Sequence, residues 1–131
     1  MTKEELKEYK KMKLELKQIN EYITKLNYDK DRIKSPLYSD MPKSFNIDNS
    51  IENILIRLEE ETEKYYNLYE KAIEKRIEIE NNICTLESPL ERTLMRYRYI
   101  ECKSWEEICI LMNYAWAQTH RIHARALKNI S

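Results

Sequence analysis

Two long stretches of the chain carry apolar residues at alternating spacings of three and four, the pattern of helices that pack along one face. In the first, Thr2 and Glu5 have the spacing of a capping box, and the pattern continues to about Lys34. Such a face needs a partner helix to cover it. The predicted face, apolar but for one lysine, comprises Tyr9, Met12, Leu16, Ile19, Ile23, Leu26, Lys30 and Ile33.

The second stretch runs from about Ser50 to Glu87 and has the same alternation. Further apolar residues in it, among them Ile54, Leu68 and Ile77, fall outside the predicted face and remain for other contacts. The predicted face comprises Ile51, Leu55, Leu58, Thr62, Tyr65, Tyr69, Ala72, Arg76, Ile79, Ile83 and Leu86.

Residues 35–50 separate the two stretches and contain two of the three prolines. They end in Asp48 and Asn49, either of which can cap the following helix. We therefore predict that residues 1–87 form a long antiparallel helical hairpin, or coiled coil, with a loop at 35–50. Because one hairpin cannot bury all of its apolar residues, we expect a homo-oligomer, most simply a homodimer.

After the hairpin, the pattern predicts three shorter helices. The sequence SPLE at residues 88–91 places a serine, a proline and a glutamate where helix starts favour them, and this helix continues to about Glu101. Ser104 and Glu107 form another capping box, which begins a short helix that ends near Met112.

A last helix is predicted from about Ala115 to Ile130, after a break at Asn113. Asparagine is the non-glycine residue best suited to a left-handed turn. A helix, a short helix, a tight turn and a longer helix make the layout of a helix-turn-helix, so residues 88–131 are predicted to be a three-helix DNA-binding domain in an all-α protein. The stripe expected to face its core comprises Thr119, Ile122, Ala126 and Ile130.

Composition and charge support this interpretation. The chain has no glycine, which removes the turn chemistry of β-hairpins. Its 23 basic and 23 acidic residues cancel overall, but residues 1–34 hold ten basic and seven acidic residues, and residues 51–87 hold five and ten. Residues 88–131 hold seven and four, and no acidic residue follows Asn113. The last helix is therefore the part that favours a polyanionic partner.

Other classes of function find little support. Without glycine there is no phosphate-binding loop or nucleophile elbow, so no enzymatic activity, cofactor or small-molecule substrate is predicted. Three cysteines without C-x-x-C spacing, and His120 and His123 three residues apart, do not make a typical metal site, so no metal is predicted. Nothing resembles a signal peptide or a membrane span, and a cytoplasmic location is expected.

Residues between Leu90 and Ile130 form a recognisable pattern, namely Leu90, Glu91, Arg92, Leu94, Arg98, Tyr99, Ile100, SWEEIC at 104–109, LMNY at 111–114 and RIHARALKNI at 121–130. With this pattern the stretch resembles the fourth region of bacterial primary sigma factors, which reads the upstream promoter element. With the helical pair before it, the chain is similar to phage transcriptional regulators of the ArpU/RinA type and their relatives in Gram-positive bacteria.

This resemblance implies a sequence-specific regulator that binds double-stranded DNA. It implies, more narrowly, a phage late-gene activator that works with host RNA polymerase in the bacterial cytoplasm. The chain departs from the sigma pattern at Trp116, where a base-reading arginine is usual, and at Ala117, where an acidic residue is usual.

The predicted DNA contacts lie on the last helix, opposite its apolar stripe. Those in the first turns are placed for base edges, and Arg125 and Lys128 for phosphates, while Gln118 suits either. Two interpretations of Trp116 stay open: contact with a thymine methyl or a sugar, or packing on Tyr114. The predicted contact residues are Trp116, Ala117, Gln118, His120, Arg121, Arg125 and Lys128.

Three alternatives remain at this stage. The last helix is an ordinary basic, solvated helix in one of them. In another, the chain is a DNA-packaging component, because small terminase subunits also join a helix-turn-helix to a helical oligomerisation region. In the third, the acidic second helix engages another protein and the sigma-like part binds polymerase without DNA.

Overall fold

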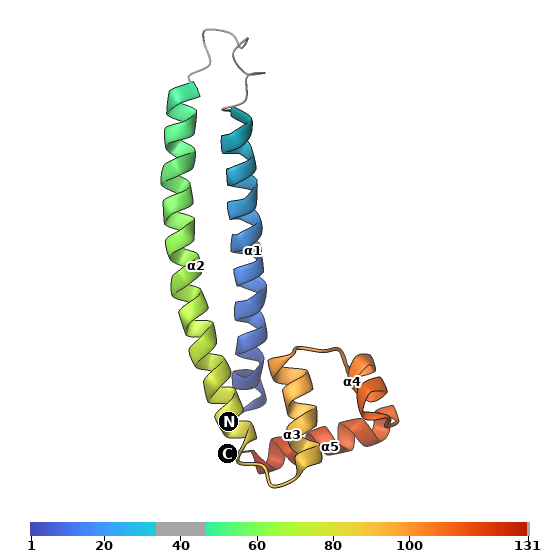
Figure 1. The fold of residues 1–131 in the computed structure, drawn as a ribbon. Helices are drawn as coiled ribbons and strands as arrows, with labels where there is room; N and C mark the ends of the chain where they lie inside the picture. Colours follow the sequence, from blue (N-terminus) through green and yellow to red (C-terminus); the bar gives the residue numbers. More distant parts are fainter. Residues whose placement is uncertain (34–46, 131) are drawn as a thin grey trace. The chain divides into compact units, whose positions relative to one another are not determined.

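The computed structural model describes residues 1–33 and 47–130, and throughout these ranges the protein is all-α, as predicted (Figure 1). The described part contains no strand, and none of its helices is long and apolar enough to span a membrane. The helices, in chain order, are α1 (Lys3–Ile33), α2 (Ile47–Ile83), α3 (Pro89–Met95), the π-helical turn η2 (Arg96–Ile100), α4 (Trp105–Met112) and α5 (Trp116–Asn129).

Contacts divide the chain into two compact units. Residues 14–70 form one, which we call the hairpin unit, and Met1–Lys13 with Lys71–Ser131 form the other, which we call the terminal unit. The domain boundary predicted between residues 87 and 88 stays a prediction.

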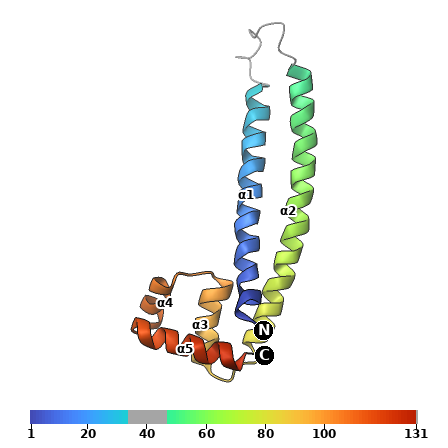
Figure 2. The same ribbon diagram turned by 180° about the vertical axis from the view of Figure 1, so that it is seen from behind.

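In the hairpin unit, α1 and α2 run antiparallel and side by side (Figures 1 and 2). The predicted face of α1 is confirmed. Leu16 and Leu26 are buried, and Ile19, Ile23 and Lys30 between and after them are half-buried. A helix whose apolar residues lie on one side buries them against its neighbour, which is the main source of stability in such a pair.

The predicted face of α2 is half right. The predicted positions that lie seven residues apart, from Ile51 to Ile79, are buried or half-buried and serve as anchors. The predicted positions between these anchors, from Leu55 to Arg76, are exposed. A mean spacing of 3.5 residues results when steps of four and three residues alternate, and from the same anchors either step can come first. In α2 the step of three residues comes first. The residues that face inward are each one position earlier than predicted, namely Ile54, Glu61, Leu68 and Lys75.

The step of three residues places Glu61 on the inner face, and a carboxylate is not expected on a buried face. The residue is only 8% exposed. Its carboxylate lies 3.1 Å from Nζ of Lys64 and 4.0 Å from the guanidinium of Arg57, so the charge is compensated while the methylene groups pack inward.

The predicted loop at 35–50 lies mostly outside the described residues. α2 already begins at Ile47, so Asp48 and Asn49 lie within its first turn and do not precede it, which corrects the predicted start at Ser50. Acidic residues are favourable throughout the first turn of a helix as well as at its cap, and sequence alone does not separate the two positions.

At its other end α2 stops at Ile83, four residues before the predicted Glu87. The backbone N–H groups of Thr85 and Leu86 donate to the carbonyls of Asn82 and Ile83, which tightens the chain into a turn. This turn carries Leu86, only 2% exposed, into the core of the terminal unit. Burial of one leucine therefore ends the helix early.

The core of the terminal unit joins the start of the chain to its last helices. Leu6 is fully buried and Tyr9 is 8% exposed, and both belong to the same cluster as the core of α3 to α5. The sequence pattern had not singled out Leu6. The remaining members are Ile79, Ile83, Leu86, Leu94, Met95, Tyr99, Ile108, Ile122, Ala126 and Ile130.

The predicted helix starts are confirmed by their hydrogen bonds. Thr2 and Glu5 exchange the two bonds of a capping box, at 2.8 and 3.2 Å between donor and acceptor. The hydroxyls of Ser88 and Ser104 each accept from the backbone N–H three residues later. These caps fix where α1, α3 and α4 begin.

Candidate nucleic-acid interface

The turn between α4 and α5 is built on Asn113, whose φ of 58° and ψ of 44° lie in the left-handed region, as predicted. The N–H of Tyr114 donates to the carbonyl of Cys109 at 3.1 Å, which closes the end of α4. Thr119, fully buried, donates its hydroxyl to the carbonyl of Ala115 at 3.0 Å and lies 3.4 Å from Sγ of Cys109. These bonds tie the start of α5 to α4 and give the two helices a fixed geometry.

Figures 1 and 2 show α5 running crosswise beneath α3, with α4 beside its first turns. Its predicted buried stripe is confirmed, because Thr119, Ile122, Ala126 and Ile130 are all at most 7% exposed. The opposite face is open to solvent. Of the predicted contact residues, those that are exposed are Trp116, Ala117, Gln118, Arg121, Arg125 and Lys128.

Three of these exposed residues, Gln118, Arg121 and Arg125, line one hollow of about 450 Å³ on the surface of the terminal unit. Ala124, which is not among the predicted contact residues, also lines it. A small residue at that position keeps the surface between the two arginines low. The hollow is therefore a place where two guanidinium groups can approach one ligand from the same side.

Arg125 also faces inward to α3. Its Nε lies 3.9 Å from a carboxylate oxygen of Glu91, whose side chain is 7% exposed, whereas that of Arg125 is 64% exposed. At 3.9 Å the two groups are too far apart for a hydrogen bond, and because the arginine is largely exposed their attraction is weak. The same carboxylate partly offsets the positive charge that Arg125 presents outward.

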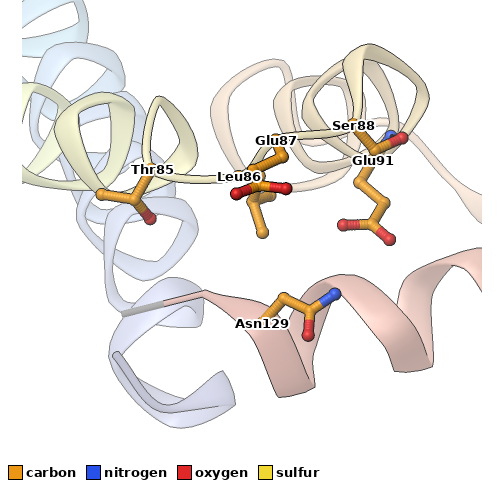
Figure 3. A pocket seen from close by; sticks show the side chains of 6 residues that line it. All are labelled: Thr85, Leu86, Glu87, Ser88, Glu91 and Asn129. Carbon is orange, nitrogen blue, oxygen red and sulfur yellow. Dashed lines mark hydrogen bonds between the residues drawn. The ribbon is translucent and has the colours of Figure 1, made fainter.

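Glu91 lines a second hollow, of about 510 Å³, between the start of α3 and the end of α5 (Figure 3). Thr85, Glu87 and Asn129 also contribute polar side chains to it. Groups of the chain itself lie against it. The guanidinium of Arg125 is 3.9 Å from the carboxylate of Glu91, and the guanidinium of Arg92 donates to the backbone carbonyls of Leu86 and Glu87 at 2.7 and 3.0 Å. We therefore regard it as part of the α3–α5 packing.

His120 lies apart from the other predicted contacts. It is half-buried, and its ring packs between Trp105 and Trp116, with 4.4 Å between ring centroids on each side. Its Nε2 is buried and makes no hydrogen bond with the described part of the chain. Because Nε2 is enclosed by protein atoms in this rotamer, a contact through it with another molecule would need the ring to turn.

Trp105 is half-buried and packs against the core. The guanidinium of Arg98 lies over its ring, 4.6 Å from the centroid, and donates to the carbonyl of Lys103 at 2.9 Å. Arg98 comes from η2, where Glu101 N–H bonds back to the carbonyl of Arg96 at 2.9 Å and widens the helix. This π-helical turn was not predicted.

Tyr99 and His123 form a buried pair that sequence reasoning missed. The tyrosine hydroxyl and Nε2 of His123 are 2.7 Å apart. Burial raises the pKa of Tyr99 to about 12 and lowers the pKa of His123 to about 4. His123 follows Ile122 and lies four residues after Thr119, so its place on the buried stripe was readable, but its partner on another helix was not.

Within the described residues, no group of three or more histidine, cysteine or acidic side chains could hold a metal ion, and Nε2 of His123 is paired with the hydroxyl of Tyr99.

Comparison of the chain with models of protein families, with curated proteins and with solved structures gave no match. Function is therefore inferred from the residues of α4 and α5 and from their geometry.

Proposed function

We propose that this protein is a sequence-specific transcription regulator that binds double-stranded DNA and places α5 in the major groove. The observation that carries the proposal is that α5 is amphipathic. One face is buried, and the other presents Arg121, Arg125 and Lys128 to solvent on a segment without an acidic residue. An α-helix fits the major groove, and basic side chains on its open face neutralise phosphates.

We assign a role in DNA binding to each of the three basic residues from its position along α5. Arg121 lies in the second turn, and its guanidinium can donate to both major-groove acceptors of a guanine. Lys128 lies in the last turn and is placed for a phosphate. Arg125 lies between them and is placed for a phosphate, and the carboxylate of Glu91, 3.9 Å away, partly offsets its charge.

The resemblance to the sigma region extends the proposal further. On that basis the protein acts on phage late genes, with host RNA polymerase as a further partner, in the bacterial cytoplasm. Nothing in the chain resembles the sigma segment that melts promoters, so activation would proceed through recruitment or stabilisation of a polymerase that already carries its own sigma factor.

We expect DNA affinity to depend steeply on salt, and the three basic residues to contribute differently. Lys128→Ala should flatten the slope of log affinity against log salt by about one unit, because one phosphate contact is lost. Arg125→Ala should flatten it by less, since Glu91 already offsets that charge. Arg121→Ala should lower specificity at one base pair by about 1–3 kcal/mol. Duplexes selected from a random pool, followed by anisotropy titrations at several salt concentrations, measure all three effects.

Lys17→Ala, an exposed lysine in the hairpin unit, is the matched control and should leave the slope unchanged. If the protein selects no sequence from the pool, the proposal fails, and binding to polymerase alone becomes the better explanation. A ring-shaped assembly found in the same preparations would favour the packaging function.

The proposal includes a homodimer formed through the hairpin unit. Large apolar side chains there remain open to solvent: Leu14 is 58% exposed, Ile56 51%, Tyr28 60% and Tyr66 64%. A second copy supplies a matching apolar surface to cover them.

Sedimentation at micromolar concentration should therefore give a dimer for the full chain and a monomer for Ile56→Glu. As a control, Ile110→Glu changes a residue of α4 that is 79% exposed and should leave the dimer intact. A wild-type chain that sediments as a monomer at these concentrations would remove the dimer from the proposal.

A further inference from the structure

We infer that Trp116 reads the methyl group of a thymine in the major groove, and that His120 and Trp105 hold its ring in position for this contact. The inference rests on the proposed function, because it assigns a ligand to one residue of the same helix.

Trp116 is the first residue of α5 and is 53% exposed. The first turns of a recognition helix are the part that approaches base edges. An indole presents an apolar face there and a single N–H donor, and it carries no charge to neutralise a phosphate. The feature of a major-groove edge that matches an apolar ring is the C5 methyl group of thymine.

The ring is supported from behind by a continuous stack. Trp116 packs on His120 with 4.4 Å between centroids and 46° between ring planes, and His120 packs on Trp105 with 4.4 Å and 43°. The guanidinium of Arg98 lies over the ring of Trp105, 4.6 Å from its centroid. Four side chains from η2, α4 and α5 therefore form one column, of which Trp116 is the exposed end.

The column is anchored in the fold. Arg98 is tied to the carbonyl of Lys103, and Trp105 also contacts the buried ring of His123 at 4.6 Å. Trp116 and His120 are four residues apart, so they lie on the same side of α5. A ring that is already ordered loses less conformational entropy on binding than a freely rotating one, and this favours a role for Trp116 in contacting DNA.

The stack also explains the unusual state of His120. Its Nε2 is buried without a hydrogen bond in the described part of the chain, a cost that its packing between two indoles offsets. His120 is thus a positioning residue for Trp116, because it is a ring on which Trp116 packs.

The test removes the methyl group alone. After selection of a binding sequence, each thymine is replaced in turn by deoxyuridine, and affinity is measured by anisotropy for the full-length wild type, W116A and W116F. For the wild type, one thymine should stand out, with a loss of about three- to fivefold, the value expected for burial of one methyl group. W116A should bind the unmodified site more weakly and show no further loss at that position. W116F, which keeps an aromatic ring, should retain most of the sensitivity.

H120A should reduce the sensitivity at the same thymine while leaving the salt slope unchanged, a readout that a merely structural role would not move. Ile110→Ala, an exposed apolar residue outside the column, is the control and should alter nothing. If the wild type and W116A lose affinity equally at every deoxyuridine, Trp116 touches a sugar or another partner and the inference is wrong. If no sequence is selected at all, the proposed function itself fails, which is a different result.

Discussion

Replacing Leu6 by alanine should lower the free energy of unfolding by about 2–5 kcal/mol, the range for a leucine removed from a close-packed core. The expectation follows from its full burial in the cluster that also contains Leu94 and Ile122. Although Leu6 lies near the start of the chain, the loss should be seen in the terminal unit. Thermal unfolding followed by the fluorescence of Trp105 and Trp116 measures it there.

Ile110→Ala is the control, since Ile110 lies in the same terminal unit but is 79% exposed, and its replacement should change the free energy of unfolding by no more than about 0.5 kcal/mol. Equal effects of the two substitutions would contradict the shared core.

Local chemistry determined which parts of the fold could be predicted. Serine caps, a proline at the first helical position and an asparagine in a left-handed turn act within four residues, so Ser88, Ser104 and Asn113 were assigned correctly from sequence. The order of threes and fours in α2 was not, because it depends on which face meets α1 and on the compensation of Glu61. The early end of α2 depends on the burial of Leu86 in a core assembled from distant segments.

The candidate interface divides in the same way. The exposed positions of Arg121, Arg125 and Lys128 follow from helical periodicity, and sequence placed them correctly on the open face. The stack of His120 between two tryptophans requires α4 and η2 to lie beside α5, and no local pattern encodes that proximity.

The pair formed by Tyr99 and His123 makes stability depend on pH. The pKa of His123 falls from 6.5 to about 4, first because burial disfavours the charged ring and then because Lys3, His120, Arg98 and Lys7 lie nearby. In the unfolded chain the ring takes up a proton as pH falls through 6.5, whereas in the folded protein it stays neutral until about pH 4. The contribution is thus fully present above 6.5 and is lost as pH falls toward 4, at up to about 1.4 kcal/mol per pH unit.

Denaturant unfolding of the wild type at a series of pH values in this window, compared with His123→Gln, isolates the effect, because the carboxylates that also titrate there are common to both. Glutamine can still bond the hydroxyl of Tyr99 but does not titrate, so its profile should be flatter by up to about 3 kcal/mol across the window. Tyr99→Phe supplies the complementary control. It should lower stability by about 1–3 kcal/mol at neutral pH, since Nε2 of His123 is left buried without a partner, yet it should keep the pH dependence. Identical profiles for the wild type and His123→Gln would show that water reaches the ring in the folded state, and the buried pair would then contribute packing but no pH dependence.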